Sequence, residues 1–351
     1  MAILGIESVV YGVDDLETCT RFWDDFGLAP LSRDAHESIF EVATGSRIIV
    51  RPRANTGIED WFDWPGVKLV TWGVDTPEAL EALVRDLERD REVRRDEDGT
   101  AHAVGDDGMP FALRVWAKRT VVSQPDPVNA PGCIQRLNQH RKWRSRARPK
   151  TLNHIVFFSH DYVKSFEFYR DRLGFRLTDH SEGLGVFARA DGTNEHHSIF
   201  WVNTALPVAP DAQGFMHLAF GLEDIDEVML GANIMAERGW TNTSANSSGG
   251  LSRHRISSAI YYYMDNPGGG EAEYHCDTDY LDDNWVPRAW DWKFGALLWA
   301  HRTPSFFRTD HDGWDMRFDP EGKSLEPFRK AALSDLPAGL GQISAQDEHA
   351  L

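Results

Sequence analysis

The stretch TLNHIVFFSHDYVKSFEFYRDRLGF (residues 151–175) has a near twin in GIESVVYGVDDLETCTRFWDDFGL (residues 5–28). Each copy reads as a short apolar strand, a turn and an amphipathic helix that ends near a glycine. The copies align without a gap, because the same 15-residue spacing separates Ser8 and His154 from an aromatic residue in the helix. A supersecondary unit is therefore used more than once in this chain.

The repeat continues beyond the first helix. Residues 67–83 (VKLVTWGVDTPEALEAL) parallel residues 215–231 (FMHLAFGLEDIDEVMLG), and the strand-like segments 109–116 and 269–276 each follow a turn. Each quarter then reads as a strand, a helix and two or three strands. We expect an α+β fold with two domains, each built from paired βαβββ modules that form curved mixed sheets, followed by a C-terminal extension.

The repeat also predicts the domain boundaries. We expect an N-terminal paired βαβββ domain without metal, a basic linker, a C-terminal catalytic domain, and a Trp-rich lid with a flexible tail, at residues 1–118, 119–149, 150–280 and 281–351. The basic run at 139–150 is interpreted as a solvated linker or an interface helix rather than an anion site. Segment 284–308 carries four tryptophans without a repeat partner, and we expect it to fold back over a domain.

Composition excludes several classes of protein. Of the 351 residues, 41% are hydrophobic and 26% are charged, which is typical of a soluble globular chain. The formal charge of −18 argues against a nucleic-acid partner, and no apolar run is long enough to span a membrane. The three cysteines form neither a disulfide framework nor a CxxC metal site, so a cytoplasmic location is expected.

Three potential metal ligands occupy equivalent strand positions in the second half: His154, His217 and Glu273. The first half has Ser8, Leu69 and Ala112 there, none of which is a strong ligand. A single histidine in an apolar strand is more often a hydrogen-bonded core residue than a ligand. However, all three are present in one half and all three are lost in the other. Two imidazoles and one carboxylate suit Fe(II), with Mn(II) as the alternative.

With these residues, the chain resembles the vicinal oxygen chelate (glyoxalase/bleomycin-resistance/dioxygenase) superfamily over residues 5 to about 280. Its closest resemblance is to the type I extradiol ring-cleavage dioxygenases, in particular those of the homoprotocatechuate and dihydroxybiphenyl type. The family's glutamate motif appears as NPGGGEAEY (266–274). The resemblance implies that His154, His217 and Glu273 are the metal ligands.

The resemblance also implies three catalytic residues. His197 matches the second member of the family's His-His pair in TNEHHSIFWV (193–202). His254 and Tyr263 lie 13 and four residues before the motif proline, as the family pattern requires. His197 would be the acid–base residue, while His254 and Tyr263 would hydrogen-bond the substrate oxygens. Taken singly, each of these residues could equally belong to the core or to a loop.

The implied activity is that of a non-haem, metal-dependent extradiol dioxygenase of aromatic catabolism. It would open a catechol-like ring beside the diol and place both atoms of O2 in the product. A carboxylated substrate is in doubt, because Gly249 stands near a position where relatives carry an arginine. The candidate anion partners are Arg253, Arg255, Arg288 and Arg302, although single arginines are more often surface or interface residues. The candidates for an aromatic pocket are Phe187, Phe200, Trp201 and Trp292, although core packing is the usual role of any one of them.

Two alternatives stay open at this point. One is another metal-dependent member of the superfamily, such as an aryl-pyruvate dioxygenase. The other is a non-catalytic protein that binds an aromatic ligand. The expected partners are a catecholic small molecule and O2, with no nucleic acid and no membrane, in a homo-oligomer. The residues do not choose between iron and manganese, between proximal and distal cleavage, or among catechols.

Overall fold

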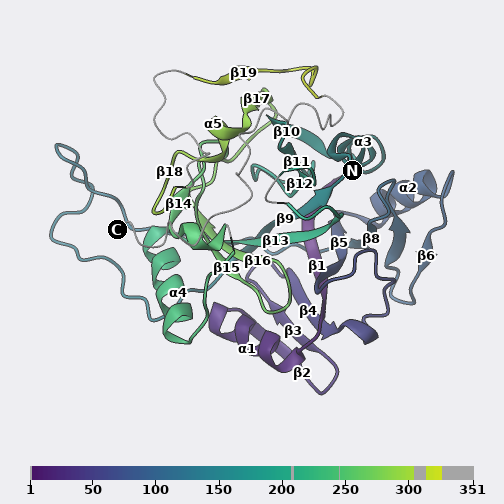
Figure 1. Cartoon of the computed structure of the whole chain (residues 1–351), viewed down its shortest axis with the longest axis horizontal. Helices are drawn as coiled ribbons and strands as arrows, with labels where there is room; N and C mark the ends of the chain where they lie inside the picture. The colour runs from purple at the N-terminus through teal and green to yellow at the C-terminus, as the bar shows by residue number, and fades with distance from the viewer. Residues whose placement is uncertain (1, 207–208, 245, 304–313, 326–351) are drawn as a thin grey trace.

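The computed structural model describes residues 2–206, 209–244, 246–303 and 314–325. Two mixed β-sheets, one from each half of the chain, form the framework, and helices pack against them (Figure 1). Each half runs twice through strand, helix and further strands. The predicted fold class, paired βαβββ modules in two curved mixed sheets, is confirmed.

The first sheet has eight strands in the order β2-β3-β4-β1-β5-β8-β7-β6. The first strands of its two modules, β1 and β5, lie antiparallel at its centre. Its elements are β1 (Ile3–Val13), α1 (Leu16–Phe26), β2 (Ala29–Arg33), β3 (Ser38–Glu41), β4 (Arg47–Pro52), the 3-10 helix η1 (Arg53–Asn55), β5 (Gly66–Val74), α2 (Pro77–Leu87), β6 (Arg94–Arg95), β7 (Ala101–Val104) and β8 (Pro110–Val115).

The second sheet has eleven strands in the order β18-β14-β15-β16-β13-β9-β12-β11-β10-β17-β19. Again the first strands of the modules, β9 and β13, are antiparallel neighbours. Its elements are β9 (Thr151–Ser159), α3 (Tyr162–Leu173), β10 (Arg176–Glu182), β11 (Gly185–Arg189), β12 (Ile199–Asn203), β13 (Gly214–Gly221), α4 (Ile225–Glu237), η2 (Ser247–Gly249), β14 (Ser252–Arg253), β15 (Ile260–Asp265), β16 (Glu271–Cys276), β17 (Arg288–Asp291), α5 (Trp292–Ala296), β18 (Trp299–Ala300) and β19 (Met316–Phe318).

The duplicated stretch folds in the same way in both halves because its helix signals are the same. Asp15 caps α1 and Asp161 caps α3, each by accepting a hydrogen bond from the backbone N–H three residues later. Both helices end at a glycine in the left-handed region, Gly27 with φ of 101° and Gly174 with φ of 74°. The cap residues therefore fix the length of both helices.

Strand register makes the two halves equivalent residue by residue. Ser8 of β1 pairs with Thr71 of β5, as His154 of β9 pairs with Ala219 of β13. On the next strand, the residue paired with Thr71 is Ala112, and the residue paired with Ala219 is Glu273. The alignment of the repeats thus holds in three dimensions.

At Leu69, the position equivalent to His217, the first half has apolar surroundings. Leu69 pairs with Val10, just as His217 pairs with Val156. Val10, Leu69 and Ala112 form a separate buried apolar cluster. Where the second half gathers polar side chains, the first half has a small hydrophobic core.

The two halves pack closely against each other. One continuous hydrophobic core contains residues of both, and Phe26 of α1 stacks on Tyr274 of β16 with ring centroids 4.1 Å apart. The turn before β16 explains the glycine run of the NPGGG segment. Gly269 has φ of 95°, and a Cβ there would lie 1.9 Å from the carbonyl oxygen of Pro65. Only glycine allows this approach of the two halves.

The segments outside the modules are attached in different ways. β17 pairs with β10 and β18 with β14, so part of the extension beyond residue 280 joins the edges of the second sheet. The last stretch, which we expect to be flexible, lies outside the described residues. None of the helices in the described part of the chain has the length and apolar character that a membrane crossing requires.

Residues 119–149 form neither helix nor strand, so the interface helix considered for the basic run is absent from this described segment. Instead, Lys142, Arg144 and Lys150 form ion pairs with Glu223, near the start of α4. The basic run therefore ties the linker to the second half. The predicted domain boundaries themselves stay a prediction.

Candidate metal centre and active site

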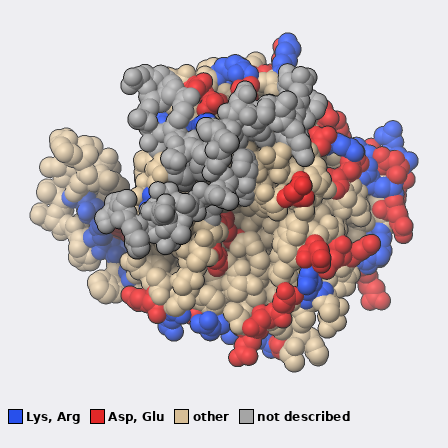
Figure 2. All heavy atoms as spheres, in the orientation of Figure 1, with Lys and Arg blue, Asp and Glu red and all other residues tan. Residues whose placement is uncertain are grey.

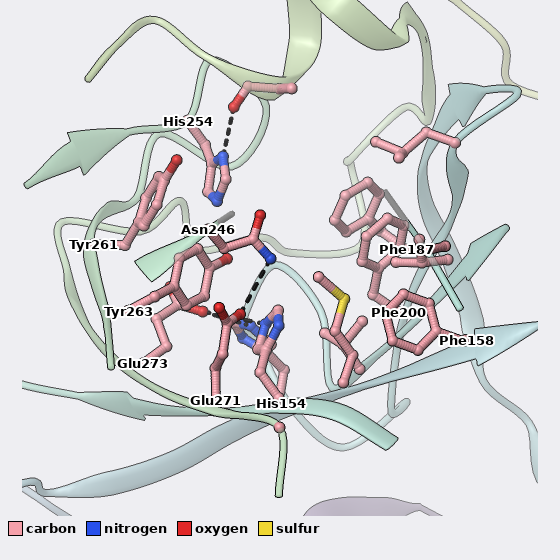
Figure 3. Close-up of a pocket in the computed structure, with 18 of the residues that line it drawn as sticks. His154, Phe158, Phe187, Phe200, Asn246, His254, Tyr261, Tyr263, Glu271 and Glu273 are labelled. Carbon is pink, nitrogen blue, oxygen red and sulfur yellow. Dashed lines mark hydrogen bonds and ion pairs between the residues drawn. The ribbon is translucent and has the colours of Figure 1, made fainter. Parts of the chain in front are cut away.

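Three neighbouring strands bring the predicted ligands together. His154 comes from β9, His217 from β13 and Glu273 from β16, and one ligand atom from each lies within 4.8 Å of the others. The Oε2 atom of Glu273 is 3.3 Å from Nε2 of both histidines. All three side chains are buried, and Glu273 is only 1% exposed. Figure 3 shows this cluster at the base of a pocket.

The charges of this cluster fit a metal cation. Burial alone would raise the pKa of Glu273, but the two adjacent imidazoles hold it well below its usual value. Burial lowers the pKa of His154. Near neutral pH Glu273 is thus ionised and His154 is neutral, the protonation states that metal ligands need. Glu273 Oε2 also has no well-oriented hydrogen-bond donor among the described residues, and a buried carboxylate oxygen without one is costly. The donor set therefore fits a bound divalent metal.

His197 lies beside the triad, just before β12. Its ring centroid is 3.9 Å from that of His154, and its Nδ1 atom is 3.0 Å from Nδ1 of His196. Burial, together with the neighbouring histidines, lowers the pKa of His197 well below its ordinary value. His197 is therefore neutral at physiological pH and can accept a proton.

His254 lies across the pocket from His154 and Glu273, in the turn between β14 and β15. Its Nδ1 atom is 2.6 Å from the carbonyl oxygen of Ala296, which can only accept, so the ring proton is on Nδ1 (Figure 3). Burial lowers the pKa of His254, which keeps the ring neutral. The ring stacks on Tyr261 with centroids 3.9 Å apart. Its Nε2 lone pair is thus available to a hydroxyl in the pocket.

Tyr263 lies on β15 directly opposite Glu273 in the antiparallel pair. Its ring centroid is 5.0 Å from that of His217. Burial, and then the charge of Glu273, raises the pKa of Tyr263 well above its ordinary value. The phenol therefore keeps its proton and can act as a hydrogen-bond donor.

All six predicted site residues line one cavity of about 560 Å³. One wall of this cavity is apolar, and in Figure 3 the labelled rings of this wall face the polar cluster from across the pocket. Phe187 and Phe200 are stacked in this wall, with centroids 3.8 Å apart. Trp64, from the first half, also reaches the cavity. No Lys or Arg is among the described residues that line it.

Several candidate pocket residues are placed differently. Phe187, Phe200 and Trp292 line the cavity, but Trp201 does not, because it is fully buried in the core against Tyr169. The core interpretation is therefore the correct one for Trp201, since its side chain points to the helix-covered face of the sheet.

The candidate arginines are also absent from the lining of the cavity. Arg253 pairs with Asp277, Arg255 donates to the carbonyl oxygen of Phe294, and Arg288 pairs with Asp179. Arg302 is exposed. These guanidinium groups have structural partners or face solvent, so they do not meet an anion in the pocket.

The sequence interpretation missed Glu271 and His275. Side chains alternate along a strand, so both lie on the same face of β16 as Glu273. Glu271 lines the cavity and accepts hydrogen bonds from Ser244 and Asn246, and burial raises its pKa. Burial lowers the pKa of His275 to about 4, and its ring lies 5.7 Å from that of His154. The alternation in EAEYH was the available signal.

The comparisons with known proteins agree with this architecture. The curated protein Metapyrocatechase 2 of Cupriavidus necator is 32% identical over 205 residues, which is 57% of this chain and 60% of that protein. The Iron-dependent extradiol dioxygenase of Rhodococcus jostii is 30% identical over 163 residues, 43% of this chain and 50% of that protein. The chain thus spans about half to three fifths of the length of these relatives.

A solved structure shares the fold over nearly its whole length. The Mn(II)-bound glyoxalase from Novosphingobium aromaticivorans superimposes with a TM-score of 0.66 at 20% identity, covering 90% of this chain and 98% of that one. The family model described as Glyoxalase/Bleomycin resistance protein/Dioxygenase superfamily matches residues 151–240. These residues contain β9 and β13 with the two histidines of the triad. Over this segment the chain is similar to the Glyoxalase/Bleomycin resistance protein/Dioxygenase superfamily.

Proposed function

We propose that this protein is a non-haem extradiol dioxygenase that opens a catechol-like ring beside its two hydroxyls and places both atoms of O2 in the product. The buried triad of His154, His217 and Glu273 at the base of an apolar cavity carries this proposal. Its similarity to two curated relatives, Metapyrocatechase 2 and the Iron-dependent extradiol dioxygenase, supports it. It also rests on His197, His254 and Tyr263, which line the same cavity.

Fe(II) is the proposed metal, because the two-histidine, one-carboxylate set suits it and a relative is named iron-dependent; Mn(II) suits the same ligands. When bound, the metal would supply a redox-active Lewis acid that lowers the pKa of the catechol hydroxyls and brings the diol and dioxygen together. His154, His217 and Glu273 would hold it. The open side of the triad faces the cavity, where a diol can approach.

The remaining polar groups have complementary roles in this proposal. His254 Nε2 accepts a hydrogen bond from a substrate hydroxyl, since Nδ1 already donates to Ala296. The Tyr263 phenol donates to a substrate oxygen and stabilises the negative charge that develops there. His197 exchanges a proton with the reacting groups on the side of the substrate ring that is next to Phe187. The ring centroids of His197 and Phe187 are 5.0 Å apart. The apolar wall excludes water from the reacting centre.

The lining of the cavity also defines a substrate class. A carboxylated catechol would meet no Lys or Arg among the described lining residues, and it would approach the buried Glu271. An apolar substituent would instead contact Phe187 and Phe200. We therefore propose an uncharged catechol with an apolar side group as the substrate. Glu271→Gln should improve turnover of carboxylated catechols relative to uncharged ones, and an unchanged preference would contradict the assigned role of Glu271.

The test is anaerobic reconstitution of the purified chain with Fe(II), followed by oxygen uptake on catechol, a phenyl-substituted catechol and a carboxylated catechol. We expect a coloured ring-opened product, formed fastest from the phenyl-substituted ring. Reconstitution with Mn(II) and with Zn(II) separates redox-active from redox-inactive metals. His154→Ser, which copies the first half, is the matched control. Metal binding without oxygen uptake on any catechol would refute the proposal.

Self-association and a cytoplasmic location also belong to this proposal. The middle of segment 119–149 projects from the body of the molecule at the left of Figure 1, and Figure 2 shows few charges at the tip of this arm. The arm exposes apolar side chains, above all Trp143 at 93%. Exposed apolar groups of this kind favour contact with a second copy. Light scattering of wild type and Trp143→Ser tests this, and a monomeric wild type would contradict it.

A further inference from the structure

A chain of buried polar groups connects His197 to the C-terminal extension, and its centre is Asp179 on β10. We infer that Asp179 and His196 are positioning residues that fix the tautomer of His197, with its proton on Nδ1 and the Nε2 lone pair available to the cavity. The catalytic meaning of this inference rests on the proposed function. The hydrogen bonds themselves do not depend on it.

The carboxyl group of Asp179 receives hydrogen bonds at both of its oxygens. Its Oδ1 atom accepts hydrogen bonds from the backbone N–H and from Nε of Arg288, at 2.9 and 3.2 Å. Its Oδ2 atom accepts from Nη2 of Arg288 at 2.7 Å and from Nε1 of Trp290 at 3.2 Å. Guanidinium and indole groups can only donate, and a two-pronged guanidinium contact stabilises a carboxylate. Asp179 is therefore an acceptor at both oxygens.

His196 carries its proton on the nitrogen that faces Asp179. Its Nε2 atom lies 3.2 Å from Oδ2 of Asp179, so Nε2 carries the hydrogen that the carboxylate accepts. A neutral imidazole has one N–H and one lone pair, so Nδ1 of His196 then carries the lone pair. Among the described residues, the hydrogen-bond partner of that atom is Nδ1 of His197, at 3.0 Å.

The hydrogen bond between His196 and His197 then decides which nitrogen of His197 carries the proton. Because Nδ1 of His196 accepts, Nδ1 of His197 must donate, and in that tautomer the lone pair of the His197 ring lies on Nε2. The rings of His154, at 3.9 Å, and Phe187, at 5.0 Å, hold the His197 ring from two sides. With Nδ1 engaged, Nε2 is the nitrogen that can take up a proton in the cavity. The opposite tautomer would present an N–H instead.

The C-terminal extension completes this arrangement. Asp179 and Arg288 are direct partners in the parallel pair of β10 and β17. The Arg288 guanidinium also lies over the rings of Trp285 and Trp290, at 4.1 and 4.8 Å from their centroids. The same extension supplies Trp292 to the cavity wall. The extension therefore contributes to the cavity wall and also holds Asp179 in place.

The direct test is ¹⁵N NMR of histidine-labelled, Zn(II)-loaded full-length protein, with the His197 signals assigned by their loss in His197→Phe. We expect the Nδ1–H tautomer in wild type. Asp179→Asn removes the charge and offers an N–H to His196, so the His197 proton should move towards Nε2. A wild-type Nε2–H tautomer, or an unchanged tautomer in Asp179→Asn, would overturn the inference.

Kinetics of the Fe(II) protein separate positioning from a merely structural role. In His196→Gln the amide can still donate to Asp179 and accept from His197, whereas His196→Phe can do neither. We expect kcat to fall about 10²-fold in His196→Phe and Asp179→Asn with little change in KM, and to be largely rescued in His196→Gln. His180→Gln is the control, because His180 is buried on β10 next to Asp179 but does not line the cavity. Equal kcat in the two His196 variants would contradict the inference.

The two readouts keep the two proposals apart. An Nδ1–H tautomer that changes in Asp179→Asn supports the inference even if no catechol is cleaved, and in that case the proposed function fails alone. Ring cleavage by a wild type that carries the Nε2–H tautomer overturns the inference and leaves the proposed function standing.

Discussion

Replacing His197 with phenylalanine removes two ring nitrogens from the cavity wall while nearly preserving the volume of the ring. The new ring would face Phe187, which already meets the His197 ring edge to face at 5.0 Å. The triad of His154, His217 and Glu273 is left intact. Metal binding should therefore survive, while proton exchange at this position is lost.

The expected magnitudes follow from the contacts of His197. Its Nδ1 atom is hydrogen-bonded to Nδ1 of His196, a buried atom that would be left without a donor. The free energy of unfolding should then fall by about 1–3 kcal/mol. General acid–base catalysis contributes roughly 10²–10⁴-fold, so kcat should fall by that factor with little change in KM.

Three measurements on one preparation decide this prediction: metal content after Fe(II) reconstitution, oxygen uptake on a phenyl-substituted catechol, and urea unfolding. His180→Phe is the control, because His180 is also buried but does not line the cavity. Turnover equal to wild type in His197→Phe would refute the acid–base role. Loss of metal together with turnover would show that His197 supports the triad instead.

Three further predictions concern metal, substrate and pH. Metal at 100 times its Kd should stabilise the wild type by about 2.7 kcal/mol over the chelated protein, whereas His154→Ser should show almost no such shift in thermal unfolding. Phe200→Ala should lower the free energy of unfolding by about 3 kcal/mol and raise KM for a phenyl-substituted catechol more than for catechol; an equal effect on both would contradict the proposed wall. Burial lowers the pKa of His180 to about 4. The contribution of this neutral ring to the free energy of unfolding should therefore be full above about pH 6.5 and fall by about 3 kcal/mol towards pH 4. Urea unfolding at a series of pH values checks this, and the pH dependence should be weaker in His180→Gln.

The repeat explains why the triad could be predicted from the sequence. Duplication supplied an internal alignment, and strand register keeps it: Ala112 and Glu273 pair with equivalent residues in the two halves. Three ligands that lie far apart in the chain could thus be grouped without any contact information. The roles of His197, His254 and Tyr263 stay predictions, although the structure brings all three to the cavity.

Other features could not be read from local patterns because they depend on long-range pairing. Asp179 and Arg288 are neighbours because β17 pairs with β10. No sequence motif predicts that this C-terminal segment joins the sheet as a strand. Trp201 and Phe200 are neighbours in one strand, yet alternation sends one to the core and the other to the cavity. Deciding which face is which required the positions of the helices.

The proposed ring cleavage is best tested by the stoichiometry of oxygen uptake by the Fe(II)-reconstituted chain on a phenyl-substituted catechol, with His154→Ser measured alongside. We expect one bound metal per chain, one O2 consumed for each ring opened, and neither metal nor uptake in His154→Ser. Ring opening that is undiminished in His154→Ser, or a fully metal-loaded wild type that consumes no oxygen with any catechol, would contradict this proposal.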